Sequence, residues 1–277
     1  MMYSISKNNL KNKINTLLFF CFLIYHWGVY SQEKMEVSGA IKIGNSEAVS
    51  PEAGTIRWTG SDVLGWAGSK WVSLTLGTTY SGEVADIEGN LYQTIILGTQ
   101  EWMAENLRTS AYRDGSLIPH VTNNTSWGNL TTGAYCWYDN DDTYEQPFGK
   151  IYNWFAVADA RGLCPMGWHV PTDAEWTTLI NFLGGAGVAG GPLKETGFNY
   201  WEFQNDGATN SSGFRGLPGS RNEDGTFPIM GFYGYWWSAN QSSDSHGGDL
   251  GLFYDGIGVN QAADDKNYGF WVRCLKD

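Results

Sequence analysis

The stretch Leu163–Trp176 reads LCPMGWHVPTDAEW and contains the start of the helix that the sequence defines best. Thr172 and Glu175 have the spacing of a capping box, in which each side chain bonds the backbone N–H of the other residue. Apolar residues then follow at the spacing of one buried helix face: Trp176, Leu179, Ile180 and Leu183. Gly184 and Gly185 end the pattern, so we predict a helix between Thr172 and these glycines.

Outward from this helix the signals are shorter. Residues 153–161 predict a second helix, with Gly162 where a left-handed cap belongs. Residues 84–97 predict a hairpin that turns at Gly89-Asn90, while 101–107 fit either a strand or a helix. Three later runs are typical of strands: Gly234–Ala239, Leu250–Tyr254 and Gly269–Leu275. The sequence therefore predicts a β-rich domain with two helices.

Three cysteines lie beyond the first apolar run of the chain: Cys136, Cys164 and Cys274. We predict a Cys164–Cys274 disulfide, which would tie the last strand to the segment between the helices, with Cys136 as a buried free thiol. A loop of about 110 residues closed this way is worth about 4.7 kcal/mol in the chain-entropy model. The alternative is a reactive pair or a metal site. The chain has no Cys-x-x-Cys spacing to favour it.

The first residues predict export. A basic segment at 7–13 precedes the apolar run Thr16–Tyr25, and Val29 and Ser31 are small enough for a cleavage site. We predict a signal peptide over 1–31 and a location in the periplasm, on the outer-membrane surface or outside the cell. The alternative, a membrane anchor, needs about 20 apolar residues, more than this run provides. No other stretch is apolar enough, so no stable span is expected after cleavage.

Charge and composition exclude several classes of protein. Removing the three leader lysines from 17 basic residues leaves 14 against 29 acidic ones, a net charge of −15. Phosphate binding needs clustered Lys and Arg, so nucleic acid is not an expected partner. The 36 glycines and 14 tryptophans are typical of a loop-rich, mostly β domain.

Residues 32–80 form a separate short segment. The stretch Pro51–Thr75 resembles the β-elements of tail-fibre and adhesin shafts. A segment this short buries little apolar surface by itself, so we expect it to contact the next domain or other copies. This predicts a stalk, with a homotrimer through 33–79 as one form of assembly.

Several motifs in the remaining chain occur in the order of one known family. They are QEWMAENLR (100–108), YCWYD (135–139), GKIYNWFA (149–156), LCPMGWHVPTDAEW (163–176), LKETG (193–197), ATNSSGF (208–214), YWWSA (235–239) and WVRCL (271–275). Residues 84–277 thus resemble the Fibrobacter succinogenes major paralogous domain. The resemblance implies an α+β, C-type-lectin-like fold with two helices and a mixed, mainly antiparallel sheet, similar to that of formylglycine-generating enzymes. It implies no established activity.

The densest group of side-chain oxygens is the loop Asp139-Asn-Asp-Asp142. Ca²⁺ takes six to eight oxygen ligands, so Asp139, Asp141 and Asp142 are candidate ligands of a structural calcium ion. The alternative is a solvated acidic turn, since the glycine and the final glutamate of an EF-hand loop are missing. His169 is expected to be a buried, hydrogen-bonded histidine.

The stretch 199–265 mixes Tyr, Trp, Asn, Ser, Asp and Gly, as antibody paratopes do. The candidate ligand-binding residues are Tyr233, Tyr235, Trp236, Asn240 and Asp244. Burial of Trp236 and Trp237 in the core is the alternative.

We therefore expect a non-catalytic, secreted or cell-surface module that binds a glycan or a surface protein. An oxidase related to formylglycine generation and a structural fibre-tip protein are the alternatives, so enzymatic activity stays open. The oxidase that the resemblance brings to mind within the wider superfold uses a pair of nearby active-site cysteines. Here Cys164 and Cys274 are expected to form the disulfide, which leaves Cys136 alone.

Overall fold

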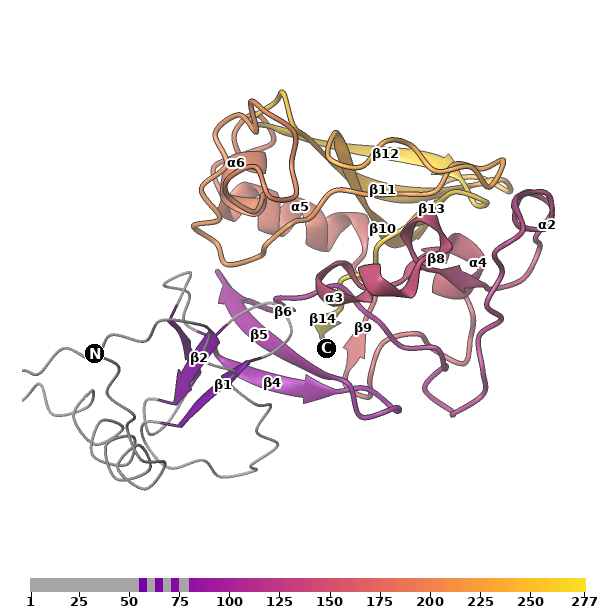
Figure 1. Ribbon diagram of the computed structural model, residues 1–277, viewed down its shortest axis with the longest axis horizontal. Helices are drawn as coiled ribbons and strands as arrows, with labels where there is room; N and C mark the ends of the chain where they lie inside the picture. Colours follow the sequence, from indigo (N-terminus) through magenta and orange to yellow (C-terminus); the bar gives the residue numbers. More distant parts are fainter. Residues whose placement is uncertain (1–54, 59–62, 67–70, 75–79) are drawn as a thin grey trace, which may run out of the picture.

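The computed structural model describes residues 55–58, 63–66, 71–74 and 80–277. The domain is α+β, with few helices and mainly antiparallel sheets. A five-stranded sheet contains β4 (Gly82–Ala85), β5 (Leu91–Leu97), β6 (Gln100–Met103), β14 (Leu275–Lys276) and β9 (Trp168–His169), in that spatial order. Its last-but-one strand, β14, therefore comes from the C-terminal end of the sequence and lies between β6 and β9 (Figure 1).

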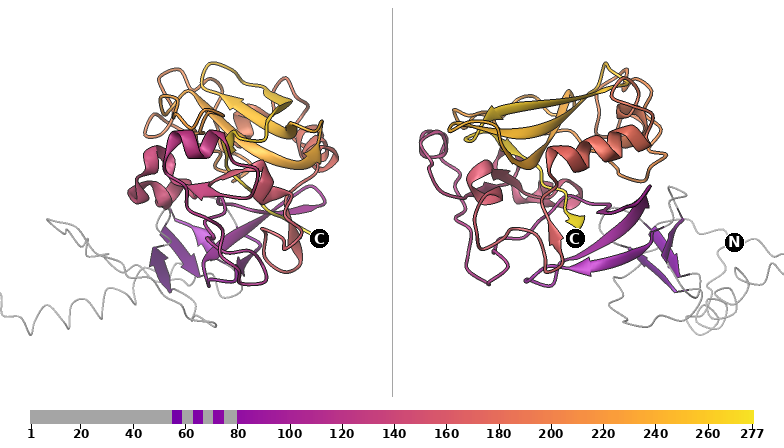
Figure 2. Two further views of the ribbon diagram at one scale, coloured as in Figure 1. Left: turned by 90° about the vertical axis from the view of Figure 1, so that its right-hand side faces the viewer. Right: turned by 180° about the vertical axis from the view of Figure 1, so that it is seen from behind.

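A second sheet is formed by the consecutive strands β10 (Tyr233–Gln241), β11 (His246–Phe253) and β12 (Val259–Asp265). The long helix α5 (Asp173–Phe182) lies between this sheet and the five-stranded one (Figure 2). Trp176 of α5 contacts Trp102 of β6, with ring centroids 4.7 Å apart. The two sheets and α5 thus share one core.

The smaller elements cover the side of this core. Strands β7 (Tyr135–Cys136), β8 (Ile151–Asn153) and β13 (Gly269–Phe270) form a third sheet. Near it are α2 (Asn124–Gly128), α3 (Glu145–Phe148), α4 (Trp154–Val157) and the 3-10 turns η1 (Tyr138–Asn140) and η2 (Asp142–Tyr144) (Figure 1). The helix α6 (Gly190–Leu193) follows α5.

Helix α5 confirms the prediction from its sequence. The Thr172 side chain accepts a bond from the Glu175 N–H, and the Glu175 carboxylate accepts one from the Thr172 N–H. Trp176, Leu179 and Ile180 are buried, as the apolar spacing predicts. Gly184 and Gly185 have φ values of +103° and +100°, which glycine adopts without strain, and the helix ends before them.

The hairpin β4–β5 is confirmed, and the segment after it is the strand β6. The helix predicted over 153–161 is much shorter: α4 ends at Val157. Asp159 accounts for the difference, because its carboxylate accepts the Arg161 N–H and its carbonyl accepts the Gly162 N–H. These bonds form a turn that replaces the next helical turn.

Tryptophan and arginine side chains fill the centre of the domain. Seven tryptophans are almost completely buried: Trp102, Trp127, Trp176, Trp201, Trp236, Trp237 and Trp271. Arg273 is buried among them and donates to Asn106 Oδ1 and to the carbonyls of Met103 and Phe214. Burial lowers the pKa of Arg273 to about 9. Its guanidinium therefore acts as a structural hydrogen-bond donor between separate segments.

The predicted disulfide between Cys164 and Cys274 is present, with the two Cα atoms 6.0 Å apart. Cys136 is a buried free thiol, as expected, and burial raises its pKa to about 12. The disulfide joins the segment before β9 to the residue before β14, so it reinforces a strand pair that hydrogen bonds already connect.

Part of the predicted stalk is described. Strands β1 (Ile56–Trp58), β2 (Val63–Trp66) and β3 (Trp71–Ser73) form a small antiparallel sheet. All three lie within Pro51–Thr75, the stretch that resembles β-elements in the sequence. The predicted signal peptide over 1–31 and the rest of the predicted stalk lie outside the described residues. Within the described residues, no helix has the length and apolar character needed to cross a membrane.

Candidate ligand-binding face

The five predicted ligand residues are found in three different environments. Tyr233 is exposed and Tyr235 is half-buried, both on β10. Trp236 is 0 % exposed, and its indole N–H donates to Asn106 Oδ1 at 2.8 Å. Trp236 is therefore a core residue, and its assignment to the ligand face is wrong. Asn240 and Asp244 are exposed near the end of β10.

Asn240 has a structural partner. Its side-chain oxygen accepts the backbone N–H of Asp173, the first residue of α5. The backbone carbonyl of Asp244 accepts a bond from the Lys266 ammonium. These residues hold the β10–β11 connection against its neighbours, while the Asp244 carboxylate stays at the surface.

Strand alternation explains why Trp236 differs from the tyrosines beside it. Successive side chains point to opposite faces of a sheet, so Tyr233, Tyr235 and Trp237 share the face that Trp236 does not. The register places Asp249 of β11 opposite Trp237 and Gly251 opposite Tyr235. We call the face that carries Tyr233, Tyr235, Asp249 and Asp264 the tyrosine–aspartate face.

Aromatic rings form one wall of the tyrosine–aspartate face. Tyr235, Phe270 and Tyr268 form an aromatic row. The Tyr235 and Phe270 rings stack with centroids 4.9 Å apart, and the Tyr268 ring centroid lies 5.5 Å from that of Phe270. A Cβ atom at Gly251 would approach the Tyr235 ring to 3.1 Å, so the glycine leaves space for that ring. The tyrosines therefore have fixed positions beside strand β11.

Asp249 is the least expected group on this face. It is 2 % exposed, and among the described residues neither of its carboxylate oxygens receives a hydrogen bond from an N–H group or a hydroxyl. The one side-chain hydrogen bond open to it is with the Asp264 carboxyl group, and this bond needs a proton on one of the two. Burial, followed by the charges of Asp264 and Asp173, raises the pKa of Asp249 to about 8. A buried carboxyl group without a donor costs free energy, so its presence needs an explanation.

Asp264 lies close to Asp249 on the same face. It pairs with Gly247 on β11, two residues before Asp249, so the two side chains are diagonal neighbours. Burial also raises the pKa of Asp264, opposed by the nearby His246 and reinforced by Glu223. Two carboxyl groups this close share a proton more readily than they both ionise. At neutral pH the pair holds a proton, mainly on Asp249.

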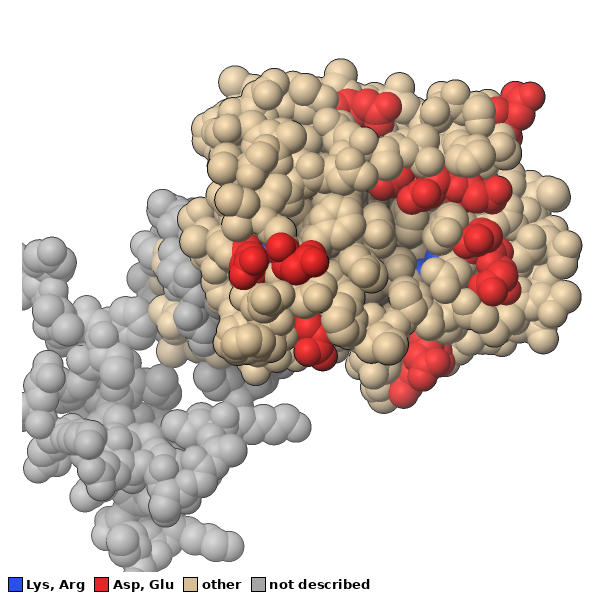
Figure 3. Space-filling view, turned by 90° about the horizontal axis from the view of Figure 1, so that it is seen from above, with Lys and Arg blue, Asp and Glu red and all other residues tan. Residues whose placement is uncertain are grey.

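The surroundings of the pair are acidic. Asp173, Glu223 and Asp265 act on the pair, and Figure 3 shows groups of acidic side chains and hardly any Lys or Arg on one face of the molecule. Burial raises the pKa of Tyr268, and a hydrogen bond from its hydroxyl to Glu223 raises it further. The field over this face therefore attracts cations and hydrogen-bond donors.

The predicted calcium ligands lie elsewhere, in η1 and η2. Asp139 has a φ of +52°, and the Asp141 carboxylate accepts bonds from the Thr143 N–H and hydroxyl. Among the described residues, no group of three or more His, Cys, Asp or Glu side chains is arranged to hold a metal ion. The local bonds of Asp141 are those of an acidic turn.

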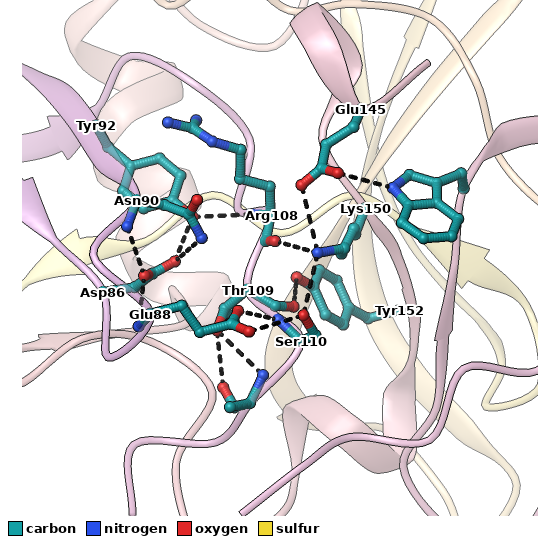
Figure 4. Close-up of polar contacts among 12 residues, drawn as sticks. Asp86, Glu88, Asn90, Tyr92, Arg108, Thr109, Ser110, Glu145, Lys150 and Tyr152 are labelled. Carbon is teal, nitrogen blue, oxygen red and sulfur yellow. Dashed lines mark hydrogen bonds and ion pairs between the residues drawn. The ribbon is translucent and has the colours of Figure 1, made fainter. Parts of the chain in front are cut away.

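A second polar cluster differs from the tyrosine–aspartate face because its groups are paired within the protein (Figure 4). Asp86 accepts bonds from the Glu88 and Asn90 N–H groups and from the Tyr92 hydroxyl. Glu88 accepts bonds from the Ser110 N–H and hydroxyl. These contacts hold the β4–β5 hairpin against the segment that follows β6.

Lys150 completes this cluster. Its ammonium is buried, donates to the Arg108 carbonyl at 2.6 Å and lies 3.3 Å from a Glu145 carboxylate oxygen. The second Glu145 oxygen accepts the Trp137 indole N–H, as Figure 4 shows. Since each charge has a partner, the cluster is best explained as a structural connection between the hairpin and α3.

A small cavity of about 210 Å³ opens beside this cluster and next to Cys164. Its polar lining residues are bonded within the protein: Arg113, for example, donates to the carbonyls of Cys164 and Trp168. The cavity therefore presents no free polar group for a ligand, unlike Asp249.

Asp249, Asp264 and Tyr268 were not predicted from the sequence. One signal was available: Asp249 stands in the run Gly247-Gly-Asp-Leu-Gly251, where alternation places it on the same face as the two outer glycines. A Cβ atom at Gly247 would clash with the Trp154 indole, so this glycine also makes room for a ring.

The Fibrobacter succinogenes major domain family matches residues 95–276. The chain belongs to this family. The match includes α5, the disulfide and all of the tyrosine–aspartate face. In this Fibrobacter succinogenes major domain, the motif QEWMAENLR begins with β6 and then supplies Asn106, whose Oδ1 joins Trp236 to Arg273. No curated protein and no solved structure matches the chain.

Proposed function

We propose that this protein is an exported, non-catalytic binding module of C-type-lectin-like fold, which recognises a surface glycan or protein through the tyrosine–aspartate face. One observation carries the proposal: Asp249 is buried beside fixed tyrosine rings with no hydrogen-bond donor for either carboxylate oxygen. Perturbed carboxyl groups of this kind concentrate at functional sites. Tyrosines in fixed positions provide contact area with little loss of side-chain entropy.

The experiment is a binding screen of the folded protein against a glycan array and against surface proteins, with and without EDTA. Tyr233 is 42 % exposed on the face, whereas Phe203 is 74 % exposed on the loop after α6. Tyr233→Ala should weaken binding and Phe203→Ala should not. Equal binding by both variants, or an absence of binding in the whole screen, would refute the proposal. If EDTA abolishes binding and Tyr233→Ala does not weaken it, the result would instead support a calcium ion at Asp139, Asp141 and Asp142.

No observation favours the oxidase alternative. That chemistry needs a pair of thiols, and among the described residues Cys136 is the one cysteine outside the disulfide. Titration of the native protein with a thiol reagent and an assay with copper test this alternative directly.

Export and assembly are separate proposals. Cleavage after Ser31 predicts that mass spectrometry of material from outside the cytoplasm finds Gln32 as the first residue. A homotrimer through 33–79 predicts a threefold mass in light scattering, which deletion of these residues should reduce to that of a monomer. A monomeric full-length protein would refute the trimer.

A further inference from the structure

Asp249 and Asp264 have an unusual electrostatic environment. The groups that act on Asp249 are Asp264 from β12 and Asp173 at the start of α5, and no cation is among them. The groups that act on Asp264 are His246, Glu223, Asp265 and Asp249 itself. Folding thus brings these two carboxyl groups together with little positive charge nearby, so ionisation of both at once is unfavourable.

The pair can be approached from the β12 side of the sheet. Ala262, which pairs with Asp249 across the two strands, is exposed, and Asp264 is half-buried. Trp237 closes the other side of Asp249 and is fully buried. A ligand would therefore meet the half-buried Asp264 carboxylate first, with the buried Asp249 diagonal to it on the neighbouring strand.

The rings around the pair favour one kind of ligand. Tyr235 and Tyr268 both interact electrostatically with Asp264, and their rings belong to the aromatic row on Phe270. Aromatic faces attract cations, and carboxylates bind ammonium and guanidinium groups through charge-assisted hydrogen bonds. A neutral hydroxyl could use these acceptors, but it would not compensate their charge.

From this arrangement we infer that the tyrosine–aspartate face binds a protonated amine or guanidinium group, presented by a Lys or Arg side chain of a protein ligand. The inference rests on the proposed binding function and specifies its chemistry. The cation sits against the Asp264 carboxylate, on the side of the pair where the aromatic row of Tyr235, Phe270 and Tyr268 lies, and it takes the place of the proton that Asp249 and Asp264 share. The displaced proton leaves to solvent. The net charge of the protein, −12 for the full chain, favours a basic partner.

The proton exchange has a consequence for pH. The pKa of Asp249 is raised to about 8 mainly by its burial, so at lower pH a cation must displace the bound proton. Binding should therefore strengthen as the pH rises toward 8, with uptake of the ligand accompanied by proton release. Asp264, Asp173, Tyr235 and the neighbouring His246 face this pair and define its titration together.

The probes are short labelled peptides that alternate glycine with lysine or with arginine, and matched peptides with norleucine or citrulline. Asp249→Asn and Asp264→Asn each should weaken binding of the lysine and arginine peptides by about tenfold or more, the usual loss for a charge-assisted bond. Asp114→Asn is the matched control, because it removes the same charge at an exposed turn outside the tyrosine–aspartate face, where an asparagine oxygen can still accept the Ser116 N–H. It should leave the affinity unchanged.

Two calorimetric measurements complete the test. Titrations in buffers of different ionisation enthalpy should show release of a proton when the lysine peptide binds. Oligomers of glucosamine and of N-acetylglucosamine test whether a sugar amine can supply the same cation. Tighter binding of the glucosamine oligomer than of either basic peptide would overturn the assignment to a protein ligand.

Equal affinity for basic and neutral peptides, or for the two Asp→Asn variants and the wild type, would overturn the inference. If the glycan or protein screen still finds a ligand that depends on Tyr233, the proposed binding function survives that result. If that screen finds no ligand either, both the inference and the proposed binding function are refuted.

Discussion

Replacing Asp249 by asparagine should make the protein more stable. At pH 7 the native protein holds a proton on this carboxyl group, which the unfolded chain releases near its usual pKa of 3.8. Because pH 7 lies about 3 units above the unfolded pKa, and each unit costs about 1.4 kcal/mol, keeping this proton destabilises the native state by about 4 kcal/mol. Asparagine needs no proton, and its amide can donate to Asp264. Its unpaired amide oxygen destabilises the variant by about 1–2 kcal/mol, so the net effect of Asp249→Asn should be a stabilisation of about 2–3 kcal/mol.

The sign of the pH dependence follows from the raised pKa of Asp249. The contribution of this group to wild-type stability is fully present below its unfolded pKa and is lost as the pH rises through about 8. The difference between Asp249→Asn and wild type should therefore be small near pH 4 and grow toward pH 8. Urea unfolding of both proteins across this range measures it. A variant that is less stable at every pH, or a difference that does not change with pH, would refute the reasoning.

Three further predictions concern other groups. Partial burial lowers the pKa of His169, but hydrogen bonds with the carboxylates of Asp277 and Glu175 outweigh it and raise this pKa. The stabilising contribution of His169 is therefore present below pH 6.5 and is lost as the pH rises through the raised pKa. In thermal melts, His169→Gln should be less stable than wild type in acid and equally stable in base. Cys164→Ser should lose about 2–5 kcal/mol in urea unfolding, and a reductant should lower the wild type to a similar stability. Cys136, buried with its pKa raised to about 12, should not react with a thiol reagent until the protein unfolds; fast labelling of the native protein would contradict its burial.

Features with a local signal were predictable from the sequence. The helix α5 follows from Thr172, Glu175 and its apolar spacing, and the β4–β5 hairpin follows from Gly89-Asn90 between two apolar runs. The disulfide was predictable because few pairings were open. His169 is hydrogen-bonded as expected, to Glu175 and Asp277, but it is only partly buried.

The site was less predictable because it depends on contacts between strands. Tyr235 and Trp236 look equally suited to a ligand in the sequence, yet adjacent strand residues point to opposite faces, and only Trp236 enters the core. Strand β12 was missed because Val259–Asp265 is mostly polar and has little apolar alternation. Without β12, nothing in the sequence brings Asp264 to Asp249. Their pairing is set by the register of β11 and β12, which a single sequence does not reveal.

The position of β14 bears on how this domain is made. Leu275 forms bridges to Trp102 on one side and to His169 on the other, so β14 joins the β4–β5–β6 part of the sheet to β9. A chain in which β14 has not yet docked would leave two strand edges open, and unpaired edges are where chains associate wrongly. The complete sheet therefore depends on contacts between segments far apart in the sequence, which cost loop-closure entropy before they stabilise the fold.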